Sequence, residues 1–260
     1  MNPIIKKILI NFGLDIGKLF VRKAGEKISE KIFPPKNYIE TPPSTYEVSD
    51  MKFREYFFGS IRSSLFDKHL TQSQVDGINN IITELWGTLS IPQLAYVLAT
   101  IYHETAKTMQ PITEYGCGKN TPYGCWKTNS KGNKYCFKNG TKTQTYTEQE
   151  NPNLFYGRGY VQLTWFDNYK RMSEELFALG VVDTVDALLV NPELANNHNI
   201  AINVTLIGMQ QGLFTGKKLS DYINNSLKDY KNARRIINGT DKAELIASYA
   251  EKFEKALLLG

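Results

Sequence analysis

Two glutamates ten residues apart are the side chains of this sequence best suited to acid–base chemistry. Glu104 follows Val97 and Ile101 at helical spacing, so it borders the apolar face of its helix. Burial beside apolar groups raises the pKa of a carboxyl group and keeps it protonated near neutral pH, as a general acid requires. An ordinary glutamate at the edge of a core has the same pattern, so Glu104 needs a partner before it indicates a site.

Glu114 is the candidate partner. It follows the helix stop expected at Pro111, in a turn that ends at Tyr115 and Gly116. A helix end followed by a returning loop can hold two carboxyl groups across a cleft. Inverting glycosidases use such a pair, about 6.5–9.5 Å apart, with one group as general acid and the other as the base that activates water. The two glutamates are therefore suited to hydrolysing a glycosidic bond.

The elements that must position these groups are mainly helical. Thr71 and Gln74 form a predicted capping box before an apolar stripe that runs to Leu85. The helix that carries Glu104 is expected to span 91–109, with Ser90 as its cap. Further helices are expected at 167–179, 194–213, 218–226, 228–237 and 240–258. The best short strand candidate is Tyr160–Leu163. We therefore predict a mainly α, two-lobed domain over 47–260, with a small β or loop insertion.

A basic arm precedes this domain. Residues 1–37 hold eight of the 31 Lys and Arg residues and three of the 26 Asp and Glu residues, which accounts for the whole formal net charge of +5. We predict an amphipathic helix within 1–33 and a proline-rich linker over 34–46. A basic arm of this kind suits a membrane surface or a virion component, with docking on its own domain as the alternative. We expect no nucleic acid partner.

A resemblance to a known family becomes specific when further motifs are considered in order. The sequence resembles the family 19 chitinases and related phage endolysins over roughly residues 70–258. The matching elements are His103-Glu104-Thr105, Glu114, the run Tyr156–Thr164, Asn168-Tyr169, the run Asn191–Ala195 and the run Arg234–Gly239. The resemblance implies a lysozyme-like helical fold and hydrolysis of amino-sugar polymers, and it implies no metal or organic cofactor.

The resemblance also implies a role for each matching position. Glu104 would protonate the leaving oxygen, Glu114 would activate water, and Thr164 would help to hold that water. Either Arg234 or Arg235 would match an arginine near the catalytic acid. The positions implied to bind substrate are Tyr156, Gln162, Asn168, Arg235 and Asn238. Thr164 and Asn168 have a structural alternative, since both residue types cap helices well and a helix is expected near residue 167.

The stretch 117–150 departs from the resemblance, because it is a polar insertion where a compact loop would be expected. Glu148 or Glu150 is therefore an alternative base to Glu114. The insertion also contains the three cysteines of the chain, which do not reproduce the disulfide framework of plant chitinases. Their spacing fits no familiar zinc pattern, so we expect no bound metal.

These observations predict a peptidoglycan hydrolase of the muramidase type, inverting, that serves phage-type lysis of the bacterial wall. Its partner would be the peptidoglycan glycan strand. The expected location is the host cytoplasm until lysis, or the virion, because the chain shows no secretory signal, no membrane span and no disulfide scaffold. The alternatives are a chitinase, a lytic transglycosylase, or a glycan-binding virion protein without activity. Retention of both Glu104 and Glu114 argues against the last of these.

Overall fold

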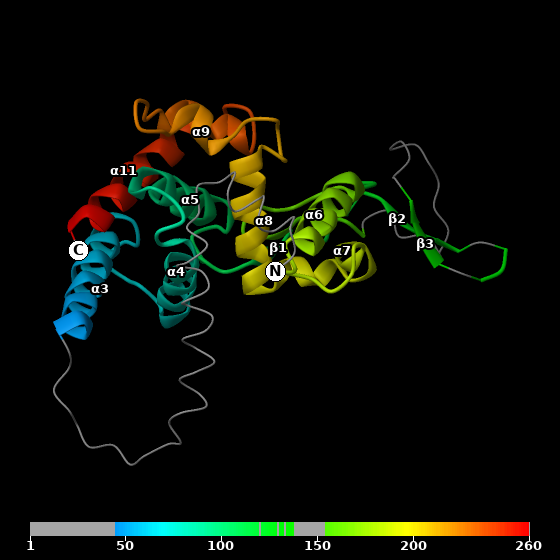
Figure 1. Cartoon of the computed structure of the whole chain (residues 1–260), viewed down its shortest axis with the longest axis horizontal. Helices are drawn as coiled ribbons and strands as arrows, with labels where there is room; N and C mark the ends of the chain where they lie inside the picture. Colours follow the sequence, from blue (N-terminus) through cyan, green and yellow to red (C-terminus); the bar gives the residue numbers. More distant parts are fainter. Residues whose placement is uncertain (1–44, 120, 129, 133, 138–153, 260) are drawn as a thin grey trace, which may run out of the picture. The chain divides into compact units, whose positions relative to one another are not determined.

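The structure is a computed structural model of the chain, and it describes residues 45–119, 121–128, 130–132, 134–137 and 154–259 (Figure 1). The chain divides into two compact units, Met1–Lys52 and Phe53–Gly260. The predicted arm at 1–33, nearly all of the predicted linker, and the alternative bases Glu148 and Glu150 lie outside the described residues. Among the described helices, none has the length and apolar character needed to cross a bilayer.

The described part of the chain is mainly helical, as predicted. The α-helices are α3 (Thr45–Ser64), α4 (Gln72–Leu85), α5 (Ile91–Glu104), α6 (Phe166–Ala178), α7 (Ala187–Val190), α8 (His198–Gln211), α9 (Leu219–Tyr222), α10 (Tyr230–Ala233) and α11 (Ala243–Leu259). Two 3₁₀ helices, η1 (Pro192–Asn196) and η2 (Arg234–Ile236), lie between them. The capping box predicted at the start of α4 is confirmed, because Thr71 and Gln74 each accept a hydrogen bond from the other's backbone N–H.

Helix α5 ends earlier than the sequence indicates. The prediction extended it to about Met109, but its last residue is Glu104. The Thr105 hydroxyl bonds back to the Ile101 carbonyl at 2.7 Å and accepts the Met109 N–H at 3.1 Å. Ala106, Lys107 and Met109 then adopt left-handed backbone conformations. The chain therefore leaves the helix directly after Glu104, which places this side chain in the last turn.

The helices predicted at 167–179 and 240–258 correspond closely to α6 and α11. Three other helix predictions were right in place but too long. The expected helix 194–213 is divided into η1 and α8 at Asn197, whose side chain caps α8 by accepting the Ile200 N–H. The expected helix 218–226 contains only the short α9, and 228–237 contains α10 followed by η2.

Two short ribbons make up the described β structure. The strands β1 (Ile112–Thr113) and β4 (Arg158–Gly159) pair antiparallel, with Ile112 opposite Gly159 and Thr113 opposite Arg158. The strands β2 (Cys125–Thr128) and β3 (Lys134–Phe137) form the hairpin expected in the insertion. The predicted strand Tyr160–Leu163 is wrong. This segment is a turn, in which Gln162 has a left-handed φ of 54° and Leu163 bonds back to Arg158.

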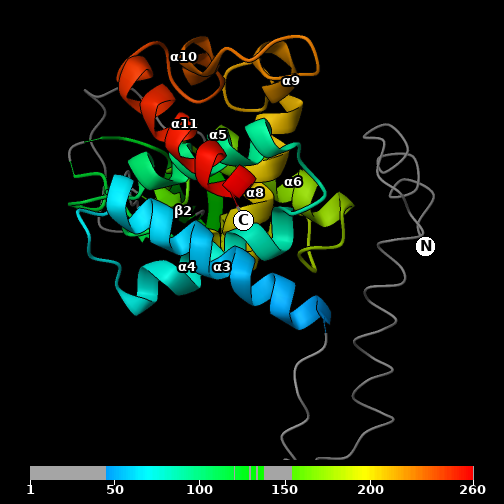
Figure 2. The ribbon, with the colours of Figure 1, turned by 90° about the vertical axis from the view of Figure 1, so that its left-hand side faces the viewer.

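The buried apolar side chains form two clusters, in agreement with a two-lobed domain. The first lies around α5, which packs along α11 (Figure 2). The second lies around α6 and α7. Helix α8 contributes to both clusters, with Ala201 and Ile202 in the first and Val204 and Ile207 in the second. It therefore links the part of the fold that carries Glu104 to the part that surrounds β4.

Candidate active site

Glu104 forms an ion pair with Arg234. Nη1 of Arg234 donates to Oε1 of Glu104 at 2.5 Å, and Nε donates to the Asp241 carbonyl at 3.0 Å. The arginine is buried, and the Glu104 side chain is 17% exposed. The position of Glu104 at the border of the core is as predicted. A buried guanidinium faces it there, so apolar neighbours are only part of its surroundings.

The sequence left open whether Arg234 or Arg235 lies near Glu104, and in the structure it is Arg234. Arg234 contacts Glu104, whereas Arg235 is exposed and its backbone carbonyl accepts the Thr215 hydroxyl at 2.6 Å. Asn238 is also exposed. The sugar contacts predicted for Arg235 and Asn238 stay predictions.

His103 precedes Glu104 and lies near the same ion pair. Burial lowers its pKa, and the neighbouring Glu104 opposes this effect while Arg234 adds to it. The lowered pKa favours the neutral form of the ring, which leaves Arg234 as the cation beside Glu104.

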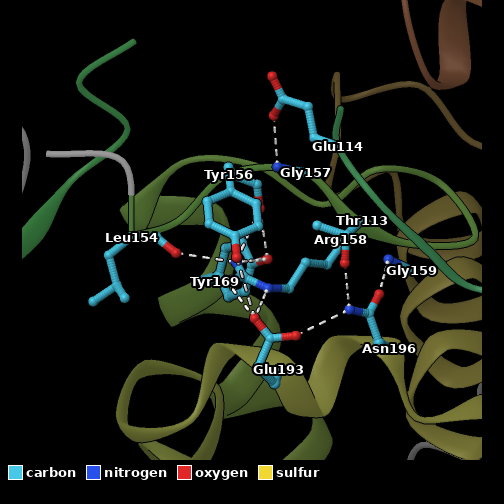
Figure 3. Close-up of polar contacts among 10 residues, drawn as sticks. All are labelled: Thr113, Glu114, Leu154, Tyr156, Gly157, Arg158, Gly159, Tyr169, Glu193 and Asn196. Carbon is cyan, nitrogen blue, oxygen red and sulfur yellow. Dashed lines mark hydrogen bonds and ion pairs between the residues drawn. The ribbon is translucent and has the colours of Figure 1, made fainter. Parts of the chain in front are cut away.

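Glu114 is held by two donors. Its Oε1 accepts the Tyr123 hydroxyl at 3.0 Å. Its Oε2 accepts the Gly157 N–H at 2.8 Å, as Figure 3 shows. Burial, followed by the hydrogen bond to Glu114, raises the pKa of Tyr123, so its phenol keeps the proton that it donates. Tyr123 was missed from the sequence, because it lies in the insertion and no local pattern indicates a contact with Glu114.

Gly157 lies between two of the predicted site residues. A Cβ atom at this position would come within 2.6 Å of Oε1 of Gln162 and 3.3 Å of Oε2 of Glu114. The amide nitrogen of Gln162 donates to the carbonyls of Ile112 at 3.0 Å and Gly159 at 3.3 Å. The structure therefore brings Glu114 and Gln162 together at the β1–β4 ribbon.

Thr164 and Asn168 lie where the ribbon leads into α6. The Asn168 side chain donates to the Thr164 carbonyl at 2.9 Å. The predicted capping by Thr164 or Asn168 is wrong, because the N-cap of α6 is Trp165 and no side chain caps this helix. The Thr164 hydroxyl makes no hydrogen bond among the described residues. Trp165 follows it with a left-handed φ of 72°, is 40% exposed and packs edge-on against the Tyr123 ring at 4.8 Å. Trp165 is therefore a partly exposed aromatic surface beside Tyr123, whose hydroxyl bonds Glu114, and no sequence motif indicated it.

Arg158 is the centre of a polar network beneath this region (Figure 3). It is 2% exposed, pairs with Glu193 at 2.7 Å and lies with its guanidinium 3.6 Å from the Tyr156 ring centre. Its Nη1 donates to the carbonyls of Leu154 and Tyr156 and to the Tyr169 hydroxyl. Tyr156 was predicted to bind substrate; its ring lies against the Arg158 guanidinium, and its hydroxyl donates to Glu193 at 3.3 Å.

Asn196 extends the network to both strands of the ribbon. It accepts the Gly159 N–H at 3.0 Å and donates to the Thr113 hydroxyl at 2.9 Å and to Glu193 at 3.2 Å. No local pattern indicates this arrangement, because η1 is far from Thr113 along the chain. Within the described residues, no group of three or more His, Cys, Asp or Glu side chains is arranged to hold a metal ion.

No protein-family model and no curated protein matches this sequence. Solved structures with a similar backbone include chitinase C from Streptomyces griseus, with a TM-score of 0.47, 20% identity, and coverage of 84% of this chain and 79% of that one. A bacterial family 19 chitinase has a TM-score of 0.43 and 20% identity, covering 78% of this chain and 93% of the other. A mutant of chitinase C has a TM-score of 0.44 and 19% identity, covering 78% and 75%. Likeness at this level concerns the arrangement of the backbone, and the chemistry has to be inferred from the side chains.

Proposed function

We propose that the chain is a glycoside hydrolase in which Glu104 is the general acid and Glu114 the base that activates water. The observation that carries this proposal is the distinct surroundings of the two carboxyl groups. Both oxygens of Glu114 accept hydrogen bonds, which suits an ionised carboxylate because a carboxylate has only acceptors. Glu104 instead faces the Arg234 guanidinium, which stabilises the negative charge that Glu104 acquires when it gives up its proton.

The other predicted site residues have places in this scheme. The Thr164 hydroxyl has no partner among the described residues, so it is available to hold the attacking water. Gln162 lies beside Glu114, across Gly157, and Trp165 offers a partly exposed ring on which a sugar can stack. No step requires a metal or an organic cofactor.

We propose peptidoglycan as the substrate, cut at a muramidase-type β-1,4 bond with inversion, in phage-type lysis of a bacterial wall. The motif resemblance includes phage endolysins, and the three cysteines of the chain do not reproduce the disulfide framework of plant chitinases. Contact of residues 1–33 with a membrane surface or a virion component belongs to the same proposal and is supported by the positive charge of that segment. A chitinase is the second candidate, since chitin has the same bond between N-acetylglucosamine units.

The test is mass spectrometry of purified peptidoglycan and of chitin oligomers after digestion by the parent, Glu104→Gln and Glu114→Gln. Glu84→Gln is the matched control, because Glu84 is an exposed glutamate on α4. We expect reducing-end muropeptides from the parent and the control, and a loss on the order of a hundredfold or more in both site variants.

Each contrary result has a distinct meaning. Cleavage by Glu104→Gln at the parental rate would overturn the proposed acid. Activity that survives in Glu114→Gln would move the base to another carboxylate, with Glu148 and Glu150 as the next variants. Cleavage of chitin oligomers alone would favour the chitinase, and anhydro-muramic ends would identify a lytic transglycosylase. Wall binding without any cleavage would identify a glycan-binding protein.

A further inference from the structure

Glu114 is attached to Gly157 in two ways. Its backbone N–H donates to the Gly157 carbonyl at 2.7 Å, and its Oε2 accepts the Gly157 N–H at 2.8 Å. The main chain and the carboxylate of Glu114 therefore both hydrogen-bond to the same residue, Gly157. Whatever fixes the orientation of Gly157 also fixes the position of the Glu114 carboxylate.

The peptide group between Tyr156 and Gly157 is held from its other end. Its carbonyl accepts hydrogen bonds from Nη1 of Arg158 at 3.2 Å and from the Tyr169 hydroxyl at 2.8 Å. A peptide group is planar, with its C=O and N–H pointing in opposite directions, so donors on the carbonyl fix the direction of the N–H. Hydrogen bonds in such a chain also polarise one another and strengthen the N–H as a donor.

The Arg158 guanidinium owes its position to Glu193. Nε and Nη2 both contact Oε1 of Glu193, at 2.8 and 2.7 Å. The Glu193 side chain is 58% exposed, whereas Arg158 is 2% exposed, so Glu193 joins a buried cation to the protein surface. Without Glu193, the guanidinium would be a buried charge without a counter-ion and would move toward solvent.

The same ion pair also constrains the residue before Glu114. Oε2 of Glu193 accepts from the Asn196 amide at 3.2 Å, and this amide donates to the Thr113 hydroxyl at 2.9 Å. Figure 3 shows the ion pair and Asn196 on one side of the ribbon, with Glu114 at its far edge. Glu114 is thus restrained through Thr113, the last residue of β1, and through Gly157, which directly precedes β4.

We propose that the Arg158–Glu193 ion pair positions the Glu114 carboxylate by holding the Tyr156–Gly157 peptide group. Arg158 and Glu193 are positioning residues in this scheme, and neither meets the substrate. The catalytic consequence rests on the proposed function, in which Glu114 is the base. The structural link itself can be measured whether or not the chain cleaves glycans.

The first experiment follows the Gly157 amide by NMR on the isotope-labelled full chain, as a function of pH. In the parent, the proton shift of this amide should change as Glu114 ionises, and Glu114→Gln should abolish the change. Glu193→Gln should reduce its amplitude by half or more, because the N–H no longer points at the carboxylate. Glu174→Gln is the matched control, since Glu174 is also a half-exposed partner of a basic side chain. An unchanged amplitude in Glu193→Gln would overturn the proposal.

Tyr169→Phe is the milder variant, useful if Glu193→Gln folds poorly. It removes one of the two donors on the Tyr156 carbonyl and keeps the buried ring in place. In this variant we expect a smaller reduction in the pH-dependent shift of the Gly157 amide. If the amplitude stayed at the parental value in both variants, the link would be contradicted.

The second experiment is steady-state cleavage of peptidoglycan. Glu193→Gln should lower kcat on the order of ten- to a hundredfold, leave KM near the parental value and displace the limb of the pH profile that reports the base. Glu193→Asp should restore part of the rate because it keeps the charge. A rise in KM with unchanged kcat would contradict the positioning role.

The two proposals fail separately. If the parent cleaves nothing and the Gly157 amide still follows Glu114 and Glu193, the proposed function is wrong and the link between the ion pair and Glu114 stands. If the parent cleaves peptidoglycan but Glu193→Gln matches it in kcat and in the Gly157 amplitude, the positioning role alone is wrong.

Discussion

Arg234 and Glu104 lie 130 residues apart in the sequence and form a 2.5 Å ion pair at the end of α5. The same guanidinium bonds to the Asp241 carbonyl, just before α11 begins. One buried side chain therefore connects the last turn of α5 with the segment that leads into α11. The long packing of α11 along α5 explains how two such distant residues come into contact.

The first prediction concerns the choice between the two arginines. Arg234→Ala leaves Glu104 with no cation at a mostly buried position, so it should lower the free energy of unfolding by about 3 kcal/mol. It should also lower kcat by about a hundredfold, because the charge that Glu104 acquires on giving up its proton is no longer stabilised. Arg235→Ala should change stability by less than about 0.5 kcal/mol. Chemical denaturation and initial rates measure both effects, and equal destabilisation by the two variants would contradict the assignment.

The second prediction uses the small space at Gly157. In Gly157→Ala the new methyl group meets Oε1 of Gln162 at 2.6 Å and Oε2 of Glu114 at 3.3 Å, so at least one of these side chains must move. Cleavage should fall about tenfold or more, since displacement of a reacting group by a fraction of an ångström is costly. Initial rates and thermal unfolding are the measurements.

The matched control for this prediction is Gly59→Ala. A Cβ atom at Gly59 meets nothing within 4 Å, and the residue lies within α3. Alanine there should stabilise the helix by about 0.5–1 kcal/mol and leave activity unchanged. Parental activity in Gly157→Ala would show that Glu114 and Gln162 do not act from the positions described.

The third prediction isolates one donor to Glu114. Tyr123→Phe removes the hydroxyl that bonds Oε1 of Glu114 and keeps the ring that packs against Trp165. A hydrogen bond to a charged group contributes about 1.5–3 kcal/mol, so kcat should fall by about tenfold or more. Tyr56→Phe, at an exposed tyrosine of α3, is the control. A pH–rate profile identical to that of the parent would mean that the hydroxyl does not act on the base.

The fourth prediction concerns pH and Glu193. Burial acts to raise the pKa of this carboxyl group, but the hydrogen bond and charge of Arg158, with smaller contributions from Asn196 and Tyr156, hold it below its ordinary value. A carboxyl group whose pKa is lowered by folding stabilises the protein above its unfolded pKa, near 4.3, and loses this contribution as pH falls through the folded pKa. The stability difference between the parent and Glu193→Gln should therefore be constant from pH 7 to about 5 and shrink below about 4. Thermal unfolding of both proteins across this pH range measures the stability difference. A stability difference that grows as pH falls would contradict the prediction.

Local patterns in the sequence were sufficient to predict most of the long helices, but α3, the longest described helix, was not predicted. The capping residues of α4 are neighbours along the chain, and the apolar spacing that predicts α5 needs no knowledge of distant residues. The end of α5 was predicted wrongly for a physical reason. The Thr105 hydroxyl satisfies backbone groups that a continued helix would have used, and hydrophobic periodicity gives no sign of such a bond.

The site residues likewise include some that local sequence patterns identify and some whose contacts depend on the packing of distant segments. Glu104 was identifiable because its position on the helix face is a local property. Its pairing with Arg234 and not Arg235, and the contact of Tyr123 with Glu114, depend on how distant segments pack. Arg158 lay inside the motif that carries the resemblance, but its partner Glu193 comes from η1 and only the folded chain shows them together.

Helix α8 contributes to the apolar cluster that also holds Ile101, one turn before Glu104, and a Cβ atom on Gly159 of β4 would meet Ala201 of α8 at 3.7 Å. The separation between the two carboxyl groups thus depends on how α8 packs. In glycoside hydrolases this separation decides whether the product keeps or reverses the configuration of its anomeric carbon. Under the proposed function, the stereochemistry of the released sugar would depend on a helix that carries neither carboxyl group.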